Sequence, residues 1–405
     1  MKTFFIKMRD VKIRDILAGF VFLAAIIPSL FYRAYLRIQG EKFWLICEEA
    51  MEAQDTGWCF FKYMNEEHKE FRTVYALSRK SPMFEEARKV GEVIDFATLK
   101  HWIYYLSAQV NISSQKGGKP NAAICYVLEV YGILKNRRVF LSHGVAMSDN
   151  NYLHYENSKI WMYITSNQSE RDYVEKVFHY PPYSVVCTGL SRFDYLTYKG
   201  NGKTILLMPS WRSWLKLPSK VDTEVDAEYH DFLDSQYYKA FQSFINNKRL
   251  NALLDKYDCK LLFYPHRNVQ KHLNQFSAGS ERVVFASNQE YEIQELLCNA
   301  DIMITDYSSV CFDFAYLCKP IIYYQFDEER FRKYQYAEGY FSYRRDGFGP
   351  VCTGETEVLN ALEDAIRGQN QEEYKRREEA FFAFHDKKNS ERIYREINKK
   401  LSMKL

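Results

Sequence analysis

The stretch 301–326, DIMITDYSSVCFDFAYLCKPIIYYQF, constrains the fold of this chain more than any other. Residues 302–304 form a short apolar run, which is typical of a strand buried on both faces of a parallel sheet. The polar residues 305–309 break that run, and the apolar residues that follow predict a helix. Because Lys319-Pro320 ends the helix and residues 321–324 begin another strand, the stretch predicts a strand–turn–helix–strand unit.

The turn of this unit carries groups that bind anions. Ser308 or Ser309 is suited to cap the N-terminus of the following helix. Two hydroxyls beside the exposed N–H groups of a helix N-terminus form a cradle for phosphate. An ordinary serine-capped turn has the same spacing, so the spacing alone leaves both interpretations open.

Strand and helix patterns alternate along most of the 405 residues, a length that predicts two domains. We therefore predict an α/β protein with two Rossmann-like domains, at 39–197 and 203–385, that face each other across a cleft. A C-terminal helix is expected at 386–405. The insertion 213–236 has no clear period, and we expect it to form a mobile loop over the cleft.

Residues 1–38 stand apart from this pattern. Their apolar segment, 16–31, has basic residues on both sides, but it is shorter than the roughly 20 residues of a spanning helix and contains Gly19 and Pro28. No clear small-residue cleavage site follows it. We expect a membrane-associating helix that lies in the inner membrane face with its basic flanks on anionic lipid. A buried helix of the globular body is the alternative.

The bulk composition excludes some classes of partner. The formal net charge is +3, so composition implies no nucleic-acid-binding surface. The nine cysteines are scattered and form no CxxC pair, which favours reduced thiols in the cytosol over a disulfide framework or a zinc site.

Polar clusters follow four predicted strands at their carboxyl ends. His143 follows VFLS, and the segments 209–212, 265–268 and 306–309 follow ILLM, LLFY and IMIT. A doubly wound fold gathers such ends at one edge of each sheet. A single histidine at a strand end is often only a structural cap. Two histidines with two arginines and two hydroxyls at four strand ends are harder to explain in that way.

This set of side chains suits a reaction at phosphorus. Arg212 and Arg267 can bind phosphate oxygens through planar forks, and Ser308 with Ser309 can hold the same anion. His266 can donate to a phosphate oxygen, and His143 can take the proton of an incoming hydroxyl. The chain has no GxxxxGK[ST], GxGxxG or GxSxG motif and no DxD pair. We expect no tightly bound cofactor and assign no metal site, although a divalent cation on a pyrophosphate stays open.

The sequence resembles the CDP-glycerol glycerophosphotransferase family, the teichoic-acid and capsule polyol-phosphate transferases of bacteria. The matching segments are DTG at 55–57, SHG at 142–144, TGLSRFD at 188–194, MPSWR at 208–212, YPHRN at 264–268, ITDYSSVCFDFA at 304–315, Gly339-Tyr340 and 347–350. The resemblance implies two Rossmann-like halves of the glycosyltransferase B type and peripheral association with the membrane. It implies that His143 is the base, that His266 is a second catalytic histidine, and that nucleotide and pyrophosphate contacts come from Pro209, Ser210, Arg212, Ser308, Ser309 and Asp313.

The chain departs from the family pattern in three places. The usual HGTP continues here as HGVAMSDN, PTWR is PSWR, and DTG replaces DNG. Loss of the Thr-Pro turn after His143 suggests an acceptor pocket of different shape, whereas PSWR keeps the hydroxyl. The role of DTG in acceptor binding is left open.

These observations predict an enzyme that transfers glycerol phosphate or ribitol phosphate from a CDP-polyol to a hydroxyl of a lipid-linked glycan and releases CMP. The expected location is the cytoplasmic face of the bacterial cell membrane. One alternative is a nucleotide-sugar-dependent glycosyltransferase or epimerase of the same architecture, which would use a UDP-sugar. The other is a non-catalytic membrane scaffold of polysaccharide assembly, which would bind no nucleotide.

Overall fold

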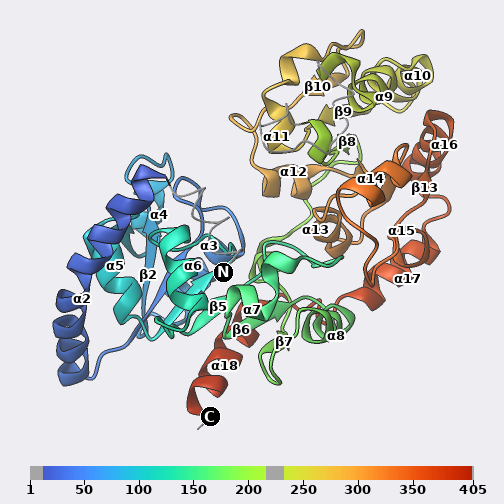
Figure 1. Ribbon diagram of the computed structural model, residues 1–405. Coiled ribbons are helices and arrows are strands. Elements are labelled where there is room, and N and C mark those ends of the chain that lie inside the picture. The colour runs from blue at the N-terminus through green and yellow to red at the C-terminus, as the bar shows by residue number, and fades with distance from the viewer. Residues whose placement is uncertain (1–11, 216–231, 404–405) are drawn as a thin grey trace. The chain divides into compact units, whose positions relative to one another are not determined.

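The computed structural model describes residues 12–215 and 232–403 (Figure 1). The chain forms two compact units. Unit 1 holds the described residues up to Val145, with 150–195 and 383–403, and unit 2 holds 146–149 and the described part of 196–382. Residues 216–231 of the predicted loop, and the basic residues before residue 12, lie outside the described residues.

Unit 1 is built on a seven-stranded parallel sheet with the order β3-β2-β1-β4-β5-β6-β7. The strands are β1 (Phe43–Cys47), β2 (Arg72–Leu77), β3 (Glu92–Asp95), β4 (Val110–Ser113), β5 (Arg138–Phe140), β6 (Met162–Thr165) and β7 (Val185–Cys187). Its helices are α2 (Ile13–Gln39), α3 (Thr56–Glu67), α4 (Phe84–Val90), α5 (Leu99–Ser107), α6 (Ala122–Val130), α7 (Tyr155–Ser158), α8 (Gln168–Val177) and α18 (Asn389–Ser402). The strand order reverses between β1 and β4, which makes that pair the topological switch point.

Unit 2 is built on a six-stranded parallel sheet with the order β10-β9-β8-β11-β12-β13. The strands are β8 (Thr204–Leu207), β9 (Lys260–Phe263), β10 (Val283–Phe285), β11 (Ile302–Thr305), β12 (Ile321–Tyr324) and β13 (Val351–Cys352). Its helices are α9 (Gln236–Ile245), α10 (Lys248–Lys256), α11 (Arg267–Gln270), α12 (Ile293–Asn299), α13 (Cys311–Tyr316), α14 (Glu328–Tyr334), α15 (Tyr343–Asp346), α16 (Glu355–Ile366) and α17 (Glu372–Phe381). Here the switch point lies between β8 and β11.

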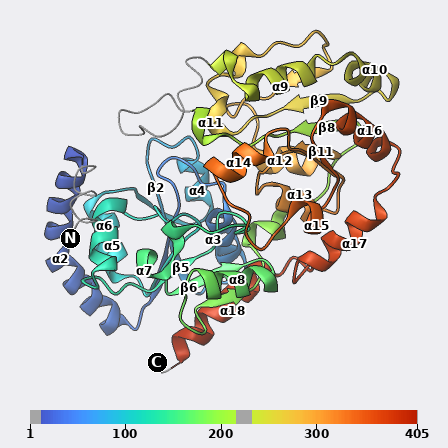
Figure 2. The ribbon, with the colours of Figure 1, turned by 45° about the vertical axis from the view of Figure 1, so that its right-hand side comes forward.

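In both units the hydrophobic core forms where apolar strands pack against the helices that cover the sheet. In unit 2, Leu207, Leu261 and Ile304 are fully buried beneath Phe241 and Leu250 of α9 and α10. Figure 2 shows α16 beside α10 over this sheet. Each fully buried side chain of this size contributes about 1.5–3 kcal/mol through removal of apolar surface from water. The predicted α/β class with two Rossmann-like sheets is confirmed.

The C-terminal helix expected at 386–405 corresponds to α18, which belongs to unit 1, because Lys400 Nζ donates to the backbone oxygens of Trp161 and Tyr183. Helix α2 continues through Gly19 and Pro28. The predicted serine cap is wrong: neither Ser308 nor Ser309 caps α13 through its hydroxyl, since Val310 occupies the N-cap position.

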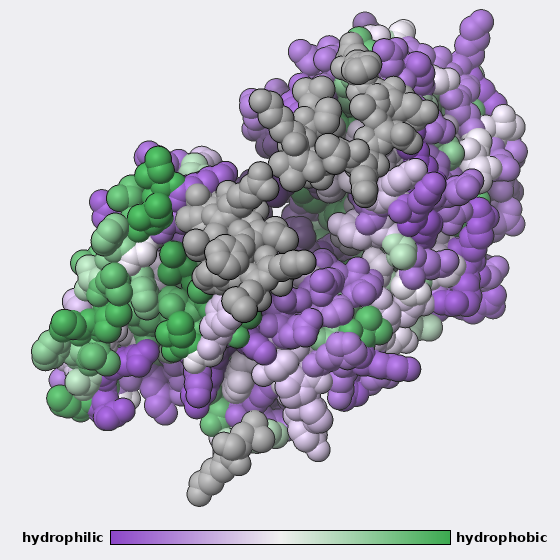
Figure 3. All heavy atoms as spheres, viewed as in Figure 1, coloured by the Kyte–Doolittle hydropathy of each residue, from purple (hydrophilic) through white to green (hydrophobic). Residues whose placement is uncertain are grey.

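Helix α2 packs on the rest of unit 1 along one face only. Arg33 Nε donates to the backbone oxygen of Leu106 at 2.7 Å, and the Tyr32 ring stacks on Tyr104 with centroids 5.2 Å apart. The opposite face is exposed and apolar; it comprises Ile13, Ile16, Leu17, Phe20, Leu23, Ile27, Leu30, Phe31, Tyr35 and Ile38. Hydrophobic residues gather over α2 in Figure 3. By length and composition α2 could cross a membrane, but its packing on α5 holds one face on the protein.

Candidate functional site

Unit 1 places polar groups at the carboxyl ends of its central strands. Asp55 follows β1 and begins α3, Gln115 follows β4, and His143 follows β5. β1 and β4 flank the switch point, and ligands of open α/β sheets bind at the carboxyl ends of such strands. His143 is the residue that the sequence singled out here, and Asp55 and Gln115 are its neighbours in the fold.

His143 and Asp55 form a hydrogen-bonded pair. His143 Nδ1 lies 2.5 Å from Asp55 Oδ2. Since an ionised carboxylate can only accept, Nδ1 carries the proton and Nε2 of the neutral ring is left with its lone pair. The ring is 68% exposed, and Nε2 makes no hydrogen bond to any residue in the described part of the chain. This arrangement presents a proton acceptor to a substrate.

Arg192 and Gln115 fix the carboxylate of Asp55. Arg192 Nη1 donates to Asp55 Oδ1 at 2.7 Å and to the backbone oxygen of His143 at 2.5 Å. The Gln115 amide nitrogen lies 3.2 Å from Asp55 Oδ2 and 2.7 Å from His143 Nδ1. Asp55 also caps α3 by accepting from the Thr56 N–H at 2.7 Å. The histidine is therefore oriented by a carboxylate that is itself held on several sides.

The charges of this pair shift both pKa values. Burial alone would raise the pKa of Asp55, but His143 and Arg192 hold it well below its usual range. Although the His143 ring is exposed, the protein atoms around it displace part of its water, which alone would lower its pKa, and the Asp55 carboxylate raises the pKa above the ordinary value. A base with a raised pKa binds the substrate proton more firmly, and it loses activity as the pH falls through that value.

A second carboxyl lies behind Asp55. Glu48 is buried and accepts from the N–H groups of Gly57 and Trp58 at 2.7 and 3.0 Å, the first turn of α3. The Ser114 hydroxyl lies against Glu48 Oε1 and 3.0 Å from Asp55 Oδ2. Burial, and then the Asp55 charge, raise the pKa of Glu48 to about 7. The Ser114 hydroxyl has one proton and can donate it to Glu48 or to Asp55, but not to both. It therefore couples the protonation states of these two carboxyl groups.

The backbone before His143 is strained. Ser142 has φ 66°, in the left-handed region that costs a non-glycine residue on the order of 1–2 kcal/mol. The Thr56 hydroxyl of α3 holds this turn by donating to the Ser142 carbonyl at 3.0 Å. The same helix thus positions Asp55 through its N-terminus and His143 through the preceding residue.

In unit 2 the segments 209–212 and 306–309 follow β8 and β11, the strands that flank the switch point. Asp306 is fully buried and joins the two segments, because its Oδ1 accepts from the N–H groups of Ser210 at 2.8 Å and Tyr307 at 2.6 Å. Pro209 accepts from the His266 N–H at 3.0 Å, which attaches the end of β9 to the same cluster. The predicted gathering of strand-end residues therefore holds within unit 2.

Arg212 does not present its guanidinium to solvent. It is 0% exposed, and its Nε and Nη2 bind the Asp327 carboxylate as a fork at 2.6 and 3.0 Å. Its Nη1 donates to Asp306 Oδ2 at 2.8 Å and to the Ser210 hydroxyl at 3.1 Å. The prediction that Arg212 binds phosphate oxygens directly is contradicted by this geometry, since carboxylates occupy the fork. Arg212 instead positions the loops that carry Ser210 and Asp306.

The remaining predicted residues differ in exposure. Ser308 and Ser309 are half-buried in the turn before α13, and the Ser308 hydroxyl accepts from the Val310 N–H at 3.4 Å. Asp313 is buried in α13, whereas Arg267 is exposed at the start of α11 and has no ion-pair partner among the described residues. Ser308, Ser309 and Arg267 are thus accessible to a ligand, and Asp313 is not.

His266 is half-buried at the N-cap of α11. Its Nδ1 accepts from the Asn268 N–H at 3.2 Å, so the neutral ring carries its proton on Nε2. His143 and His266 therefore have opposite tautomers: Nε2 carries a lone pair in His143 and a proton in His266. This difference matches a proton acceptor and a hydrogen-bond donor.

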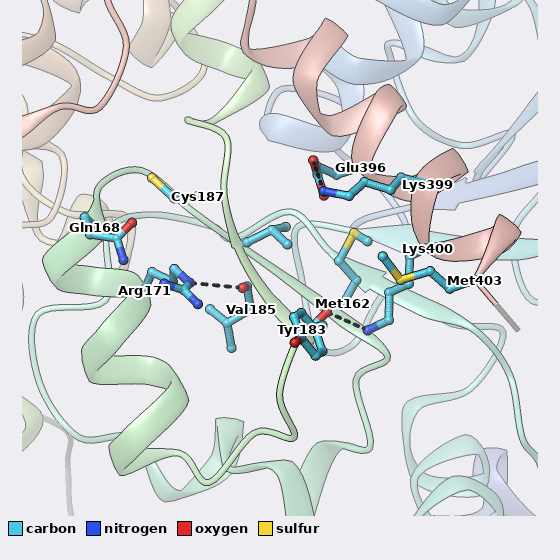
Figure 4. A pocket seen from close by; sticks show the side chains of 11 residues that line it. Met162, Gln168, Arg171, Tyr183, Val185, Cys187, Glu396, Lys399, Lys400 and Met403 are labelled. Atoms are coloured by element: carbon cyan, nitrogen blue, oxygen red, sulfur yellow. Dashed lines mark hydrogen bonds and ion pairs between the residues drawn. The ribbon is translucent and has the colours of Figure 1, made fainter. Parts of the chain in front are cut away.

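A cavity of about 280 Å³ lies elsewhere in unit 1 (Figure 4). It is lined by residues of β6, α8, β7 and α18, among them Arg171, Lys399 and Lys400. Lys400 binds the backbone at Trp161 and Tyr183, before β6 and β7, and Cys187 at the end of β7 also lines the cavity, so the cavity extends along β7 beside α18. It is separate from the strand ends that carry His143. Among the described residues, no group of three or more His, Cys, Asp or Glu could hold a metal ion.

With the geometry established, comparison with known proteins decides the family. The sequence model of the family described as CDP-Glycerol:Poly(glycerophosphate) glycerophosphotransferase matches residues 30–399. The chain belongs to this family.

Two curated relatives are similar to this chain. The minor teichoic acid biosynthesis protein GgaB of Bacillus subtilis is 29% identical over 385 residues, which are 92% of this chain and 41% of that protein. A teichoic acid glycerol-phosphate transferase of Staphylococcus aureus is 26% identical over 53% of this chain and 54% of its own length. The chain thus spans about half the length of these relatives.

Several solved structures share the fold of this chain. The wall teichoic acid polymerase TagF has a TM-score of 0.63 and 16% identity, over 96% of this chain and 98% of that one. The MnaA–UDP structure from Staphylococcus aureus has a TM-score of 0.57 and 16% identity, over 89% of this chain and 97% of that one. At these identities the likeness concerns the fold alone, and it agrees with the expected glycosyltransferase B type.

Sequence reasoning missed several residues of the unit 1 site. Asp55 and Arg192 lie in the DTG and TGLSRFD segments, but their pairing with His143 was not foreseen, and Glu48, Ser114 and Gln115 carried no signal. A carboxylate that precedes a helix by one residue is commonly an N-cap. This local role gives no indication that Asp55 also binds His143. The chemistry of His143, a residue that needs an orienting partner, is the signal that could have prompted a search for Asp55.

Proposed function

We propose that the chain transfers a polyol phosphate, glycerol phosphate or ribitol phosphate, from a CDP-polyol to a hydroxyl of a lipid-linked cell-surface glycan and releases CMP. Family membership supports the donor class. The observation that carries the chemistry is the His143–Asp55 pair, which leaves Nε2 of an exposed ring ready to take a proton. Unit 2 would bind the donor at the strand ends that carry Ser308, Ser309 and His266.

The step is a displacement at phosphorus. The acceptor oxygen forms a bond to the phosphorus that bears the polyol, and its proton passes to His143 Nε2. The bond between that phosphorus and the bridging oxygen breaks, and CMP leaves with the electron pair. The His266 Nε2–H and the Ser308–Ser309 turn stabilise charge on the phosphate oxygens as it develops. The product is a phosphodiester, and no oxidant or reductant is needed.

The experiment is a comparison of donors. CDP-glycerol, CDP-ribitol and a UDP-sugar are incubated in parallel with the full chain and lipid-linked acceptors extracted from bacterial membranes. Release of CMP from one CDP-polyol, dependent on acceptor, is the expected result. Release of UDP, or turnover of the UDP-sugar alone, would instead indicate the glycosyltransferase or epimerase. Absence of both turnover and nucleotide-induced thermal stabilisation would indicate the scaffold.

Helix α2 supports the proposed location at the cytoplasmic face of the membrane. One face is attached to unit 1 through contacts such as Arg33 with Leu106, and the other exposes ten large apolar residues. We propose that α2 lies in the interface plane, since a helix fixed along one side to a globular unit cannot be surrounded by lipid. Arg14 and Arg37 would contact anionic headgroups near its two ends.

Vesicle sedimentation tests this location. The double variant F20E/I27E places charges on the exposed face of α2 without touching the face that packs on α5, since both side chains are more than 60% exposed. It should bind phosphatidylglycerol vesicles at least tenfold more weakly than wild type. The matched control is I133E, because Ile133 is similarly exposed, at 68%, outside α2. Equal binding by F20E/I27E and wild type would contradict the proposal.

A further inference from the structure

Helix α14 forms one wall of the unit 2 cluster. The Phe331 ring stacks on Tyr307 with centroids 3.8 Å apart, and Asp327, just before the helix, holds Arg212. Gln335, just after the helix, accepts from the Ser213 N–H at 2.9 Å and donates to the Trp211 carbonyl at 3.2 Å. The helix is therefore fixed against the segments that follow both β8 and β11.

Arg332 lies in this helix without a carboxylate partner among the described residues. Its guanidinium carbon is 6.0 Å from the centroid of the Tyr307 ring and 5.7 Å from that of Tyr343. Its Nε is buried and makes no hydrogen bond. Other arginines of unit 2 are paired: Arg344 binds Glu328, and Arg377 binds Glu373. A buried N–H without an acceptor is unfavourable, and the rest of this half-buried guanidinium has no anion among the described residues, so an anionic ligand at Arg332 would be stabilised.

Two features suit Arg332 to a phosphate ligand. A guanidinium offers a planar fork of N–H donors that matches two phosphate oxygens, and contact with aromatic faces restricts its orientation. Tyr307, which it faces, directly precedes Ser308 and Ser309, whose side chains are half-buried in the turn before α13. The cation therefore lies at the ring of the residue that directly precedes the two serines in the chain.

We propose that Arg332 binds the diphosphate group of the donor nucleotide, together with Ser308 and Ser309. This inference rests on the proposed function and names the residue that takes the part first expected of Arg212. The Arg212 fork is occupied by Asp327, whereas the Arg332 fork has no such partner in the described chain. The chemical class of the ligand is a nucleoside diphosphate or its polyol ester.

Binding of cytidine, CMP and CDP to the full chain, measured by titration calorimetry, tests the proposal. Arg332→Gln should weaken CDP about tenfold or more and change cytidine by less than about twofold, since only the charge-assisted phosphate contact is lost. Lys333→Gln is the matched control, because it removes a cation from the same helix at an exposed position. It should leave CDP affinity unchanged.

The outcomes separate this proposal from the proposed function. Wild-type affinity for CDP in a folded Arg332→Gln variant overturns the role of Arg332 while the function stands. If that variant fails to fold, Arg332→Lys decides, since it keeps the charge without the fork and should weaken CDP severalfold. If wild type binds UDP and not CDP, the proposed donor is wrong, and the same comparison made with uridine and UDP tests Arg332.

Discussion

The sequence predicts that Arg212 and Arg267 both bind phosphate oxygens, but the structure buries the first and exposes the second. A matched pair of variants tests whether their roles differ. Arg212 is fully buried between two carboxylates. Arg212→Ala leaves Asp306 and Asp327 buried without their cation, a change that typically costs about 3–5 kcal/mol. In a domain of this size each kcal/mol lowers the unfolding midpoint by about 2–4 °C. The expected loss for unit 2 is therefore roughly 6–20 °C.

The assay is thermal unfolding followed by CDP titration of the same samples. Arg267→Ala serves as the comparison, since Arg267 is exposed and has no ion pair in the described chain. It should unfold within about 1 °C of wild type. If Arg212→Ala unfolds like wild type and loses only its CDP affinity, Arg212 is a phosphate ligand after all and the positioning role is refuted.

Two further predictions concern titrating carboxyl groups. Asp55→Asn removes the charge that raises the pKa of His143, so the acid limb of the pH–rate profile should move to lower pH and turnover should fall on the order of 10²-fold. Asp95→Asn, which changes a carboxylate at the end of another strand, is the control. An acid limb that stays in place in Asp55→Asn would argue against the pairing of Asp55 with His143. Glu378 is buried, and burial raises its pKa to about 9 from 4.5, so the carboxyl opposes folding increasingly as the pH rises from 4.5 towards 9. Glu378→Gln should therefore stabilise the protein by up to about 3 kcal/mol at pH 7 and hardly at all at pH 4.5; a gain that is independent of pH would contradict this origin.

The strands and the polar residues at their carboxyl ends were predictable because they depend on local patterns. A buried parallel strand is a short apolar run, and polar residues that follow such a run lie at one edge of the sheet. This reasoning placed His143, Ser210, His266 and Ser308 at strand ends, where the structure has them.

The pairings at the site were not predictable, because they join distant residues. Asp55 and His143 are separated by 88 positions and meet only because the loops after β1 and β5 converge. The burial of Arg212 between carboxylates could not be predicted from the sequence either, since a guanidinium fork fits a carboxylate as well as a phosphate. Helix α2 continues through Pro28 because its packing on α5 outweighs one missing hydrogen bond.

The most direct test of the account is the turnover of His143→Asn with a CDP-polyol and its lipid-linked acceptor, measured as CMP release. His179→Asn, the same substitution at an exposed histidine of unit 1, is the control. We predict a loss of turnover on the order of 10²-fold or more for His143→Asn, with unchanged thermal unfolding, and full activity for His179→Asn. Turnover of the His143 variant within about twofold of wild type would contradict it.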